Sequence, residues 1–260
     1  MLVKLRVSPL WNRYVKSAFC LIAVLGMSLI ANAASDIYTA AVDHAGRPTA
    51  DKERDKAEYP AEILRLGGIK PGMNVLDFLA GGGYYSELLS HIVGPAGHVV
   101  MLNNAAYDGW STGWEKRVDS NRLPNVEHKT VDLNRMGLGD NTFDAVVLVK
   151  VYHDLYMVDP SWPKVDIPAT LDQIVKALKP GGTILLIDHS AKPGTGTRDA
   201  NSLHRIDEAF ARKEFESRGL KLVAESQLLR RKDDKRDELS YKGPIVGKTD
   251  RFALVFRKPA

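Results

Sequence analysis

Cysteine is nearly absent from the 260-residue chain, whose single cysteine is Cys20. This residue lies in an N-terminal apolar stretch that we expect to be removed, so the mature protein would contain no cysteine. Disulfides, thiolate nucleophiles and cysteine-ligated metal sites are therefore excluded. Internal repeats and long Gly/Ser or Pro linkers are also lacking. With 44% hydrophobic and 26% charged residues, the composition is that of an ordinary globular protein.

Acidic residues are missing from residues 1–33, which carry four basic residues. An apolar run of 13 residues (18–30) follows the basic stretch, and small residues at 31–33 end the segment. This pattern predicts a signal peptide cleaved after Ala33, because the run is shorter than the ~20 residues of a membrane-spanning helix. A permanent anchor is the weaker interpretation, and translation from Met27 would instead give a cytoplasmic protein. We expect a periplasmic or secreted protein that meets the membrane only during export.

Net positive charge is absent from the rest of the chain. The formal charge of +4 equals the four basic residues of the N-terminal segment, which leaves 32 basic and 32 acidic residues from position 34 onward. Nucleic-acid binding is favoured by a basic stripe interleaved with stacking aromatic side chains. The one local basic cluster, at 230–236, is interrupted by acids. We therefore expect a small-molecule partner rather than a nucleic acid, while the oligomeric state stays undetermined.

From residue 73 the chain alternates between strand and helix patterns. Continuous or weaker apolar runs predict strands at 74–79, 98–103, 126–132, 143–149 and 183–188. Helical spacing is found at 84–93, 105–122, 168–178 and 201–218. Two final strands, around 220–228 and 252–257, have no helical crossover and must be antiparallel. The predicted fold is α/β, a doubly wound, mostly parallel, seven-stranded sheet with a C-terminal antiparallel hairpin. It would occupy residues 67–260, behind an N-terminal helical cap at 34–66.

Three glycines, Gly81, Gly82 and Gly83, connect the first of these strands to a helix. Backbone N–H groups at such a helix start can face an anionic group. About 20 residues later a second strand ends at Asn103, where a ribose would be met, and a third ends near Asp132, whose carboxylate can accept from an adenine amino group. The alternatives are a plain strand–helix turn for the glycines and a helix N-cap for Asp132.

These elements are followed in order by a Phe-Asp-Ala-Val strand at 143–146 and a Leu-Lys-Pro-Gly-Gly turn at 178–182. The ordered set resembles the class I S-adenosylmethionine-dependent methyltransferases over roughly residues 68–259. A narrower similarity, to a poorly characterised exported bacterial group, rests on residues 47–64 and 247–252. The resemblance implies the cofactor S-adenosyl-L-methionine. It also implies that Asp77 and the Gly81–Gly83 backbone hold its methionine end, Asn103 its ribose, and Asp132 with the Leu133 backbone its adenine.

Two positions depart from that family. Leu79 occupies the first glycine of the usual loop, which we expect to tighten the turn rather than abolish it. Asn103 stands where most members carry an acid for the ribose hydroxyls, and loss of that charge costs on the order of 1 kcal/mol of binding. The same departure disfavours NAD, whose recognition depends on an acid there. A non-catalytic module that binds a nucleoside-like ligand on the same fold is the alternative to an enzyme.

Histidines and acids gather where the fourth and fifth strands end. They are His153 and Asp154 after the fourth strand, Asp188 and His189 at the end of the fifth, and His204 on the following helix. Asp207 is expected to share one side of that helix with His204. Our hypothesis is that His153 is the general base for a small or medium-sized acceptor, methylated on O or N. Asp154, Asp188, His189 or His204 would orient it. Hydrogen-bonded structural residues are the alternative. A metal site formed by the same residues is a second alternative, since histidines and carboxylates can ligate a divalent ion. No His-x-x-x-His or similarly tight spacing supports it, so no metal ligand is assigned.

Overall fold

The computed structural model of the chain describes residues 36–119 and 122–260, and the expected signal peptide at 1–33 lies outside them. One seven-stranded β-sheet forms the centre of the molecule. Its strands are β1 (Asn74–Phe78), β2 (His98–Asn103), β3 (Val126–Thr130), β4 (Phe143–Val149), β5 (Leu178–His189), β6 (Lys221–Ser226) and β7 (Arg251–Arg257).

The strands lie in the order β3-β2-β1-β4-β5-β7-β6. Strands β1 to β5 pair in parallel, whereas β7 runs antiparallel to both β5 and β6. The predicted mostly parallel sheet with a C-terminal antiparallel hairpin is confirmed. The chain runs outward from β1 to β3 and then returns to β4 on the other side of β1. Ligands of open α/β sheets bind outside the carboxyl ends of the strands at such a switch point, so a site is expected beyond β1 and β4.

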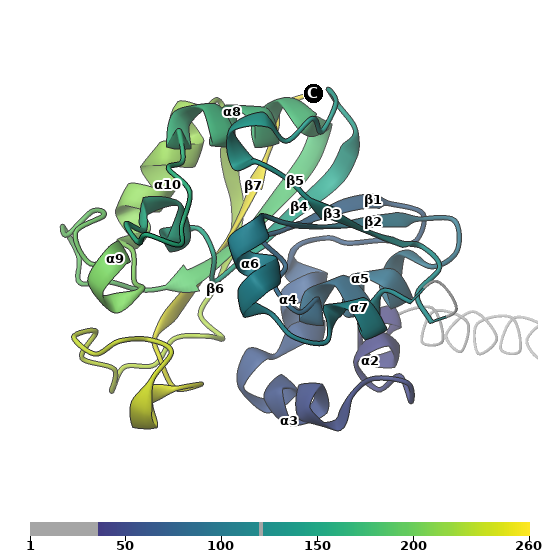
Figure 1. The fold of residues 1–260 in the computed structure, drawn as a ribbon, viewed down its shortest axis with the longest axis horizontal. Helices are drawn as coiled ribbons and strands as arrows, with labels where there is room; N and C mark the ends of the chain where they lie inside the picture. The colour runs from purple at the N-terminus through teal and green to yellow at the C-terminus, as the bar shows by residue number, and fades with distance from the viewer. Residues whose placement is uncertain (1–35, 120–121) are drawn as a thin grey trace, which may run out of the picture.

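Both faces of the sheet are covered, which is what continuous apolar strands require. Successive side chains point to opposite faces, so Leu76 and Val146 belong to one apolar core while their neighbours Val75 and Val147 belong to the other. Helices α8 (Ile167–Ala177) and α10 (Glu208–Ser217) cover the first face, and α2 (Ile37–Val42), α4 (Pro60–Leu66) and α5 (Tyr84–Val93) cover the second (Figure 1).

The other helices lie between these elements along the chain. They are α3 (Thr49–Glu58), α6 (Ala105–Trp110), α7 (Trp114–Arg117), α9 (Ala200–Leu203) and the 3-10 helices η1 (Leu133–Arg135), η2 (His153–Tyr156) and η3 (Gly243–Ile245). The single helix predicted at 105–122 is wrong, because Gly113 at φ 80° separates α6 from α7. The one predicted at 201–218 is likewise divided, since His204 at φ 50° ends α9 before α10 begins.

The fifth strand begins earlier than the sequence pattern predicts. It starts at Leu178 and includes the Leu-Lys-Pro-Gly-Gly segment, with an irregular register between Phe143 and Ala145 of β4. Gly182 is required in this irregular stretch. A Cβ atom there would lie 2.8 Å from Leu178 Cδ1 and 3.0 Å from the Asp144 carbonyl oxygen, too close for any side chain.

The N-terminal helices are tied to the sheet by a buried ion-pair network around Glu58, the last residue of α3. Its carboxylate contacts Lys150 Nζ at 2.6 Å and also the guanidinium of Arg251 at the start of β7. Burial alone would raise the pKa of Glu58, but Lys150 and Arg251 outweigh burial and lower it to about 2. Glu58 and Arg251 are 3% and 1% exposed, so neither charge has water as an alternative partner.

We expect Glu58→Gln to lower the free energy of unfolding by about 3 kcal/mol at pH 7, because it leaves a buried guanidinium without its counter-charge. The folded pKa of Glu58 lies below the ordinary 4.5, so its contribution is complete above that pH and is lost as the pH falls towards 2. Urea unfolding of both proteins at neutral and acidic pH measures this. Glu62→Gln, at an exposed position of α4, is the control. An equal stability difference at both pH values would contradict a stabilising role for the ionised Glu58 carboxylate.

Candidate active site

A small cavity of about 180 Å³ lies where β1 ends and α5 begins. The chain bends sharply here, with φ of 51° at Leu79, 57° at Gly81 and 78° at Gly83. Leu79 therefore adopts the left-handed conformation that glycine has more easily, at a cost of roughly 1–2 kcal/mol. Its side chain is buried, 2% exposed. The turn is therefore formed although Leu79 replaces the usual first glycine, as expected.

Asp77, the predicted partner of the methionine end, lines this cavity. Its carboxylate accepts a hydrogen bond from Ser86 Oγ at 2.6 Å, and burial raises its pKa to about 7. The Tyr85 hydroxyl is buried at the same cavity and has no hydrogen-bond partner among the described residues. Arg54 of α3 and Arg117 of α7 also line it. This lining suits the charged end of an amino acid. The carboxylate can accept from an ammonium group, and the two guanidinium groups and the free hydroxyl can face a carboxylate.

Asn103 is fully buried and is engaged with the glycine loop. Its Oδ1 accepts from Gly81 N at 2.9 Å, and its Nδ2 donates to Gly81 O at 3.0 Å and to Asp108 Oδ1 at 2.8 Å. The side chain thereby fixes the bend of the loop. The charge missing at Asn103 is carried next to it by Asp108, a residue that the sequence analysis did not identify. The sequence feature that could have identified Asp108 is an acid in the first turn of the helix after β2.

Asp132 and Leu133, the predicted adenine contacts, do not line the cavity that holds Asp77. The Asp132 side chain is exposed and accepts from Asn134 N at 2.9 Å, which is the N-cap arrangement of η1. Tyr107 and Ser111 lie over the glycine loop, with Ser111 Oγ 3.4 Å from the position that a Cβ at Gly81 would take. Contacts of Asn103, Asp132 and Leu133 with a nucleoside therefore stay predictions.

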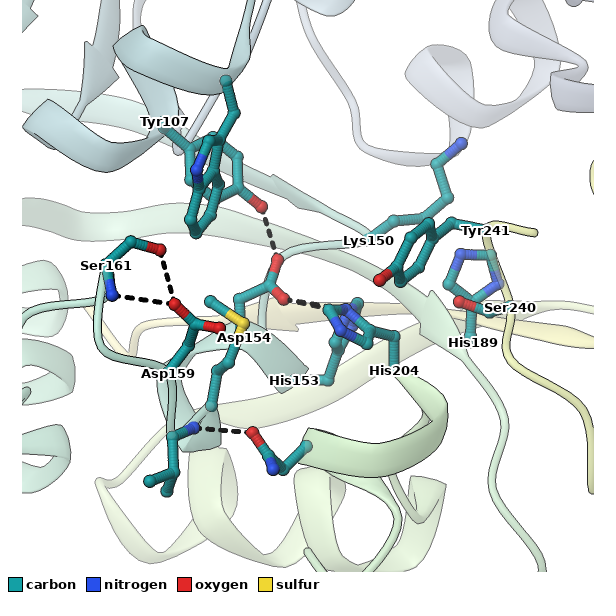
Figure 2. A pocket seen from close by; sticks show the side chains of 14 residues that line it. Tyr107, Lys150, His153, Asp154, Asp159, Ser161, His189, His204, Ser240 and Tyr241 are labelled. Atoms are coloured by element: carbon teal, nitrogen blue, oxygen red, sulfur yellow. Dashed lines mark hydrogen bonds and ion pairs between the residues drawn. The ribbon is translucent and has the colours of Figure 1, made fainter.

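A larger pocket of about 710 Å³ lies beyond the ends of β4 and β5 (Figure 2). This volume is within the range of sites that hold small organic ligands. Its lining mixes aromatic, charged and polar groups: Tyr107, Trp110, Lys150, His153, Asp154, Met157, Val158, Asp159, Ser161, His189, Asn201, His204, Ser240 and Tyr241. Four of the five residues predicted for the acceptor side are among them.

The fifth, Asp188, lies fully buried behind the pocket at the end of β5. It accepts from the backbone N–H of His153 at 2.8 Å and of His189 at 2.7 Å, and its Oδ1 lies 2.6 Å from His153 Nδ1. The other nitrogen of His153, Nε2, lies 3.1 Å from Asp154 Oδ1. The predicted clustering of all five residues is therefore present in the structure.

His204 reaches the cluster by a different route from the predicted shared helix face. It is the left-handed C-cap of α9, and pairing of Ile206 with the end of β5 holds this turn against the pocket. The prediction that Asp207 shares a helix side with it is wrong. Asp207 is the N-cap of α10, where its carboxylate accepts from Ala209 N and Gly194 N.

The two innermost histidines have opposite electrostatic surroundings. Burial would lower the pKa of His153, but Asp154 and Asp188 outweigh it and raise the pKa to about 10. Burial and the nearby Lys150 and His153 charges hold the pKa of His189 well below its usual value. At neutral pH His153 is therefore an imidazolium and His189 a neutral imidazole, whose Nδ1 lies 2.8 Å from Thr249 Oγ1.

Comparison with known proteins agrees with this geometry. A protein family described as a methyltransferase domain matches residues 51–228, more than half of the chain. The chain therefore belongs to this methyltransferase family. Among curated proteins, a ubiquinone/menaquinone biosynthesis C-methyltransferase, UbiE, from Saccharophagus degradans is 28% identical over 127 residues, which cover 48% of this chain and 46% of the relative. The chain thus spans about half the length of the curated relatives it matches.

Solved structures share the fold at low sequence identity. An S-adenosylmethionine-dependent methyltransferase from Aquifex aeolicus has a TM-score of 0.55 and 22% identity, covering 78% of this chain and 97% of the other. The cyclase SpnF has a TM-score of 0.55 and 15% identity, covering 84% of this chain and 85% of the other. The predicted Rossmann-like methyltransferase fold is confirmed, and S-adenosyl-L-methionine is the cofactor that agrees with the family. The cyclase shows that one fold carries more than one activity.

We expect Asp77→Asn to weaken S-adenosylmethionine binding and to remove its pH dependence. An ammonium group needs the carboxylate form, so the affinity of the native chain falls up to about tenfold for each pH unit below 7. Calorimetry over about two pH units around neutrality measures this, with Asp43→Asn, an exposed acid, as the control.

The same variant should be more stable than the native chain at alkaline pH. The folded pKa of Asp77, about 7, lies above its ordinary 3.8, so ionisation of the buried group lowers stability as the pH rises through 7. A shift of about three units corresponds to a gain of up to about 4 kcal/mol in the variant. Thermal unfolding measures it. Unchanged cofactor affinity together with lower stability would contradict the role given to Asp77.

Proposed function

We propose that the chain transfers a methyl group from S-adenosylmethionine to a small or medium-sized acceptor held in the 710 Å³ pocket. The observation that carries this proposal is the position of the two cavities. Val149 lines the cavity of Asp77, and the next residue, Lys150, lines the larger pocket. A cofactor whose amino-acid end lies beside Asp77 would therefore have its reactive centre close to a separate, ligand-sized space.

Bound S-adenosylmethionine supplies the methyl group on a positively charged sulfur. The acceptor atom forms its bond to the methyl carbon while the carbon–sulfur bond breaks, and S-adenosylhomocysteine is the second product. When the acceptor carries a proton, a neutral base must take it. The pKa contrast in the pocket supports His189 Nε2 for this role, because His153 is already protonated at neutral pH. His153, Asp154 and His204 would then position the acceptor.

The lining of the pocket indicates the kind of acceptor that would fit. Trp110, Tyr241 and Met157 offer flat or flexible apolar surface, whereas Asn201 and Ser161 offer polar groups. An acceptor with an apolar body and a polar group directed towards His189 satisfies both. The curated relatives are named as carbon methyltransferases, so oxygen, nitrogen and carbon acceptors all belong in the test.

Replacement of His189 tests the base. His189→Ala should lower the rate of S-adenosylhomocysteine formation by about 10²–10⁴-fold, the usual contribution of a general base, while cofactor affinity stays unchanged. A panel of phenols, amines and activated carbon acids provides the acceptors, with His98→Ala, outside both cavities, as the control. Normal turnover by His189→Ala would reject the base. Tight cofactor binding by the native chain, with no turnover on the whole panel, would favour the ligand-binding module.

We also propose that the protein is exported to the periplasm by the signal peptide at residues 1–33. Its support is the basic, apolar and small-residue order of that segment. No helix among the residues described is long and apolar enough to span a bilayer. A fusion of the full chain to alkaline phosphatase, which is active only after export, should give activity and a mature N-terminus at Ala34. An inactive fusion with an intact N-terminus would reject export.

A further inference from the structure

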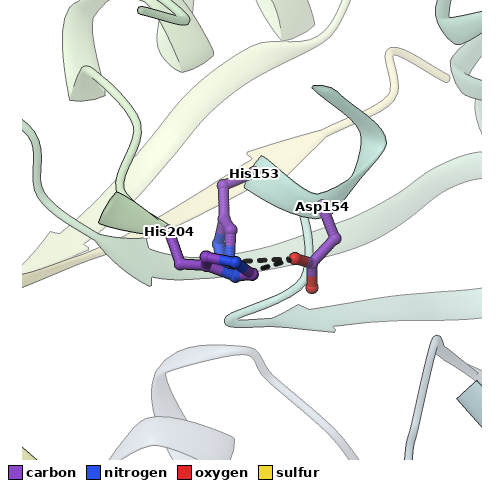
Figure 3. Close-up of side chains that lie close together, drawn as sticks. All are labelled: His153, Asp154 and His204. Carbon is purple, nitrogen blue, oxygen red and sulfur yellow. Dashed lines mark hydrogen bonds and ion pairs between the residues drawn. The ribbon is translucent and has the colours of Figure 1, made fainter. Parts of the chain in front are cut away.

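Three ligand-type atoms converge on one point at the wall of the 710 Å³ pocket. They are His153 Nε2, Asp154 Oδ1 and His204 Nδ1, and Figure 3 shows the three side chains turned towards one another. The first two side chains are buried, and His204 is partly exposed at the pocket surface. Two imidazoles and one carboxylate form a donor set that is typical of first-row transition-metal ions.

The spacing of these atoms matches that of ligands on a single ion. They form a nearly equilateral triangle, with 3.1 Å between His153 Nε2 and Asp154 Oδ1, 3.2 Å between the two nitrogens, and 3.3 Å between His204 Nδ1 and Asp154 Oδ1. Metal–ligand bonds of about 2.0–2.2 Å at angles between tetrahedral and octahedral place two donors about 2.8–3.6 Å apart. All three edges lie within that range.

The groups behind these donors are those that hold metal ligands in place. His153 Nδ1 lies 2.6 Å from Asp188 Oδ1, an arrangement of carboxylate and histidine that directs Nε2 towards an ion. The remaining oxygen of Asp154, Oδ2, accepts from the Tyr107 hydroxyl. His204 has a left-handed backbone, uncommon for a residue other than glycine, and its ring joins the cluster.

We propose that His153, Asp154 and His204 bind one divalent transition-metal ion, which displaces to solvent the Nε2 proton that His153 carries in the metal-free chain. Three protein ligands on one side leave the other coordination positions open to the 710 Å³ pocket, as in metal sites that act on a substrate. The site stands independently of methyl transfer. Its consequence for the acceptor rests on the proposed function. The acceptor would be a molecule with an oxygen that ligates the ion close to His189. The ring centroids of His153 and His189 are 6.1 Å apart.

Cobalt(II) is a suitable probe, because its visible absorption reports coordination by nitrogen and oxygen. The full chain, stripped with EDTA, is titrated with Co²⁺, and Zn²⁺ is then added in competition. We expect one ion per chain. His204→Asn and Asp154→Asn should each weaken binding by more than about 100-fold, and Asp188→Asn, behind His153, by about 10–100-fold. Asn at 204 tolerates the left-handed backbone, so this variant removes the imidazole without breaking the turn.

His189→Ala is the matched control, because His189 lines the same pocket but is not one of the three ligands. It should bind Co²⁺ as the native chain does. Absence of binding in the native chain would overturn the proposal. So would binding that survives both His204→Asn and Asp154→Asn, or binding that is lost equally in His189→Ala.

Cofactor calorimetry and methyl-transfer assays on the metal-loaded and stripped chains separate this inference from the proposed function. Methyl transfer by a native chain that binds no Co²⁺ would remove the metal site and leave the function standing. Binding of one Co²⁺ per chain that is weakened by the ligand variants, without cofactor binding, would keep the metal site and reject the proposed function.

Discussion

The acceptor side of this molecule depends on one buried carboxylate, that of Asp188. It accepts from two backbone N–H groups and contacts one imidazole nitrogen, and these contacts join the end of β5 to the turn after β4. Asp188 is fully buried and does not line the pocket, so it acts through the residues that it contacts. Its effect is to fix the positions of His153 and His189, on which the pocket chemistry is built.

Of the N-terminal helices, α3 lines the cavity of Asp77 and is connected to the larger pocket through an ion pair. Helix α3 contributes Asp51 and Arg54 to the cavity of Asp77, and its last residue, Glu58, holds Lys150 at the wall of the larger pocket. The two cavities have different electrostatics as a result. One contains a carboxyl group that burial keeps partly protonated, and the other contains a charged and a neutral histidine side by side. Titratable groups whose pKa values are pushed apart by their surroundings are typical of active sites.

The strands were predictable because two covered faces require continuous apolar runs, and helix α5 at 84–93 agrees with its apolar spacing to the residue. The clustering of His153 and Asp188 was also predictable, since parallel strands end at one edge. The breaks at Gly113 and His204 were not, because periodicity does not report a residue that leaves the helical conformation. The hydrogen bonds of Asn103 to Gly81 and Asp108 were not predictable either, because they depend on tertiary packing, and its contact with a ribose stays a prediction.

The central claim is that the glycine bend after β1 holds the amino-acid end of the cofactor. A crystal structure of the chain with S-adenosylhomocysteine tests it most directly. We expect the ammonium group beside Asp77 and the sulfur facing the 710 Å³ pocket. We also expect a shift of Tyr107 and Ser111, since 180 Å³ is below the volume of an ordinary ligand site. A cofactor bound elsewhere, with the cavity of Asp77 filled by its own side chains, would contradict it.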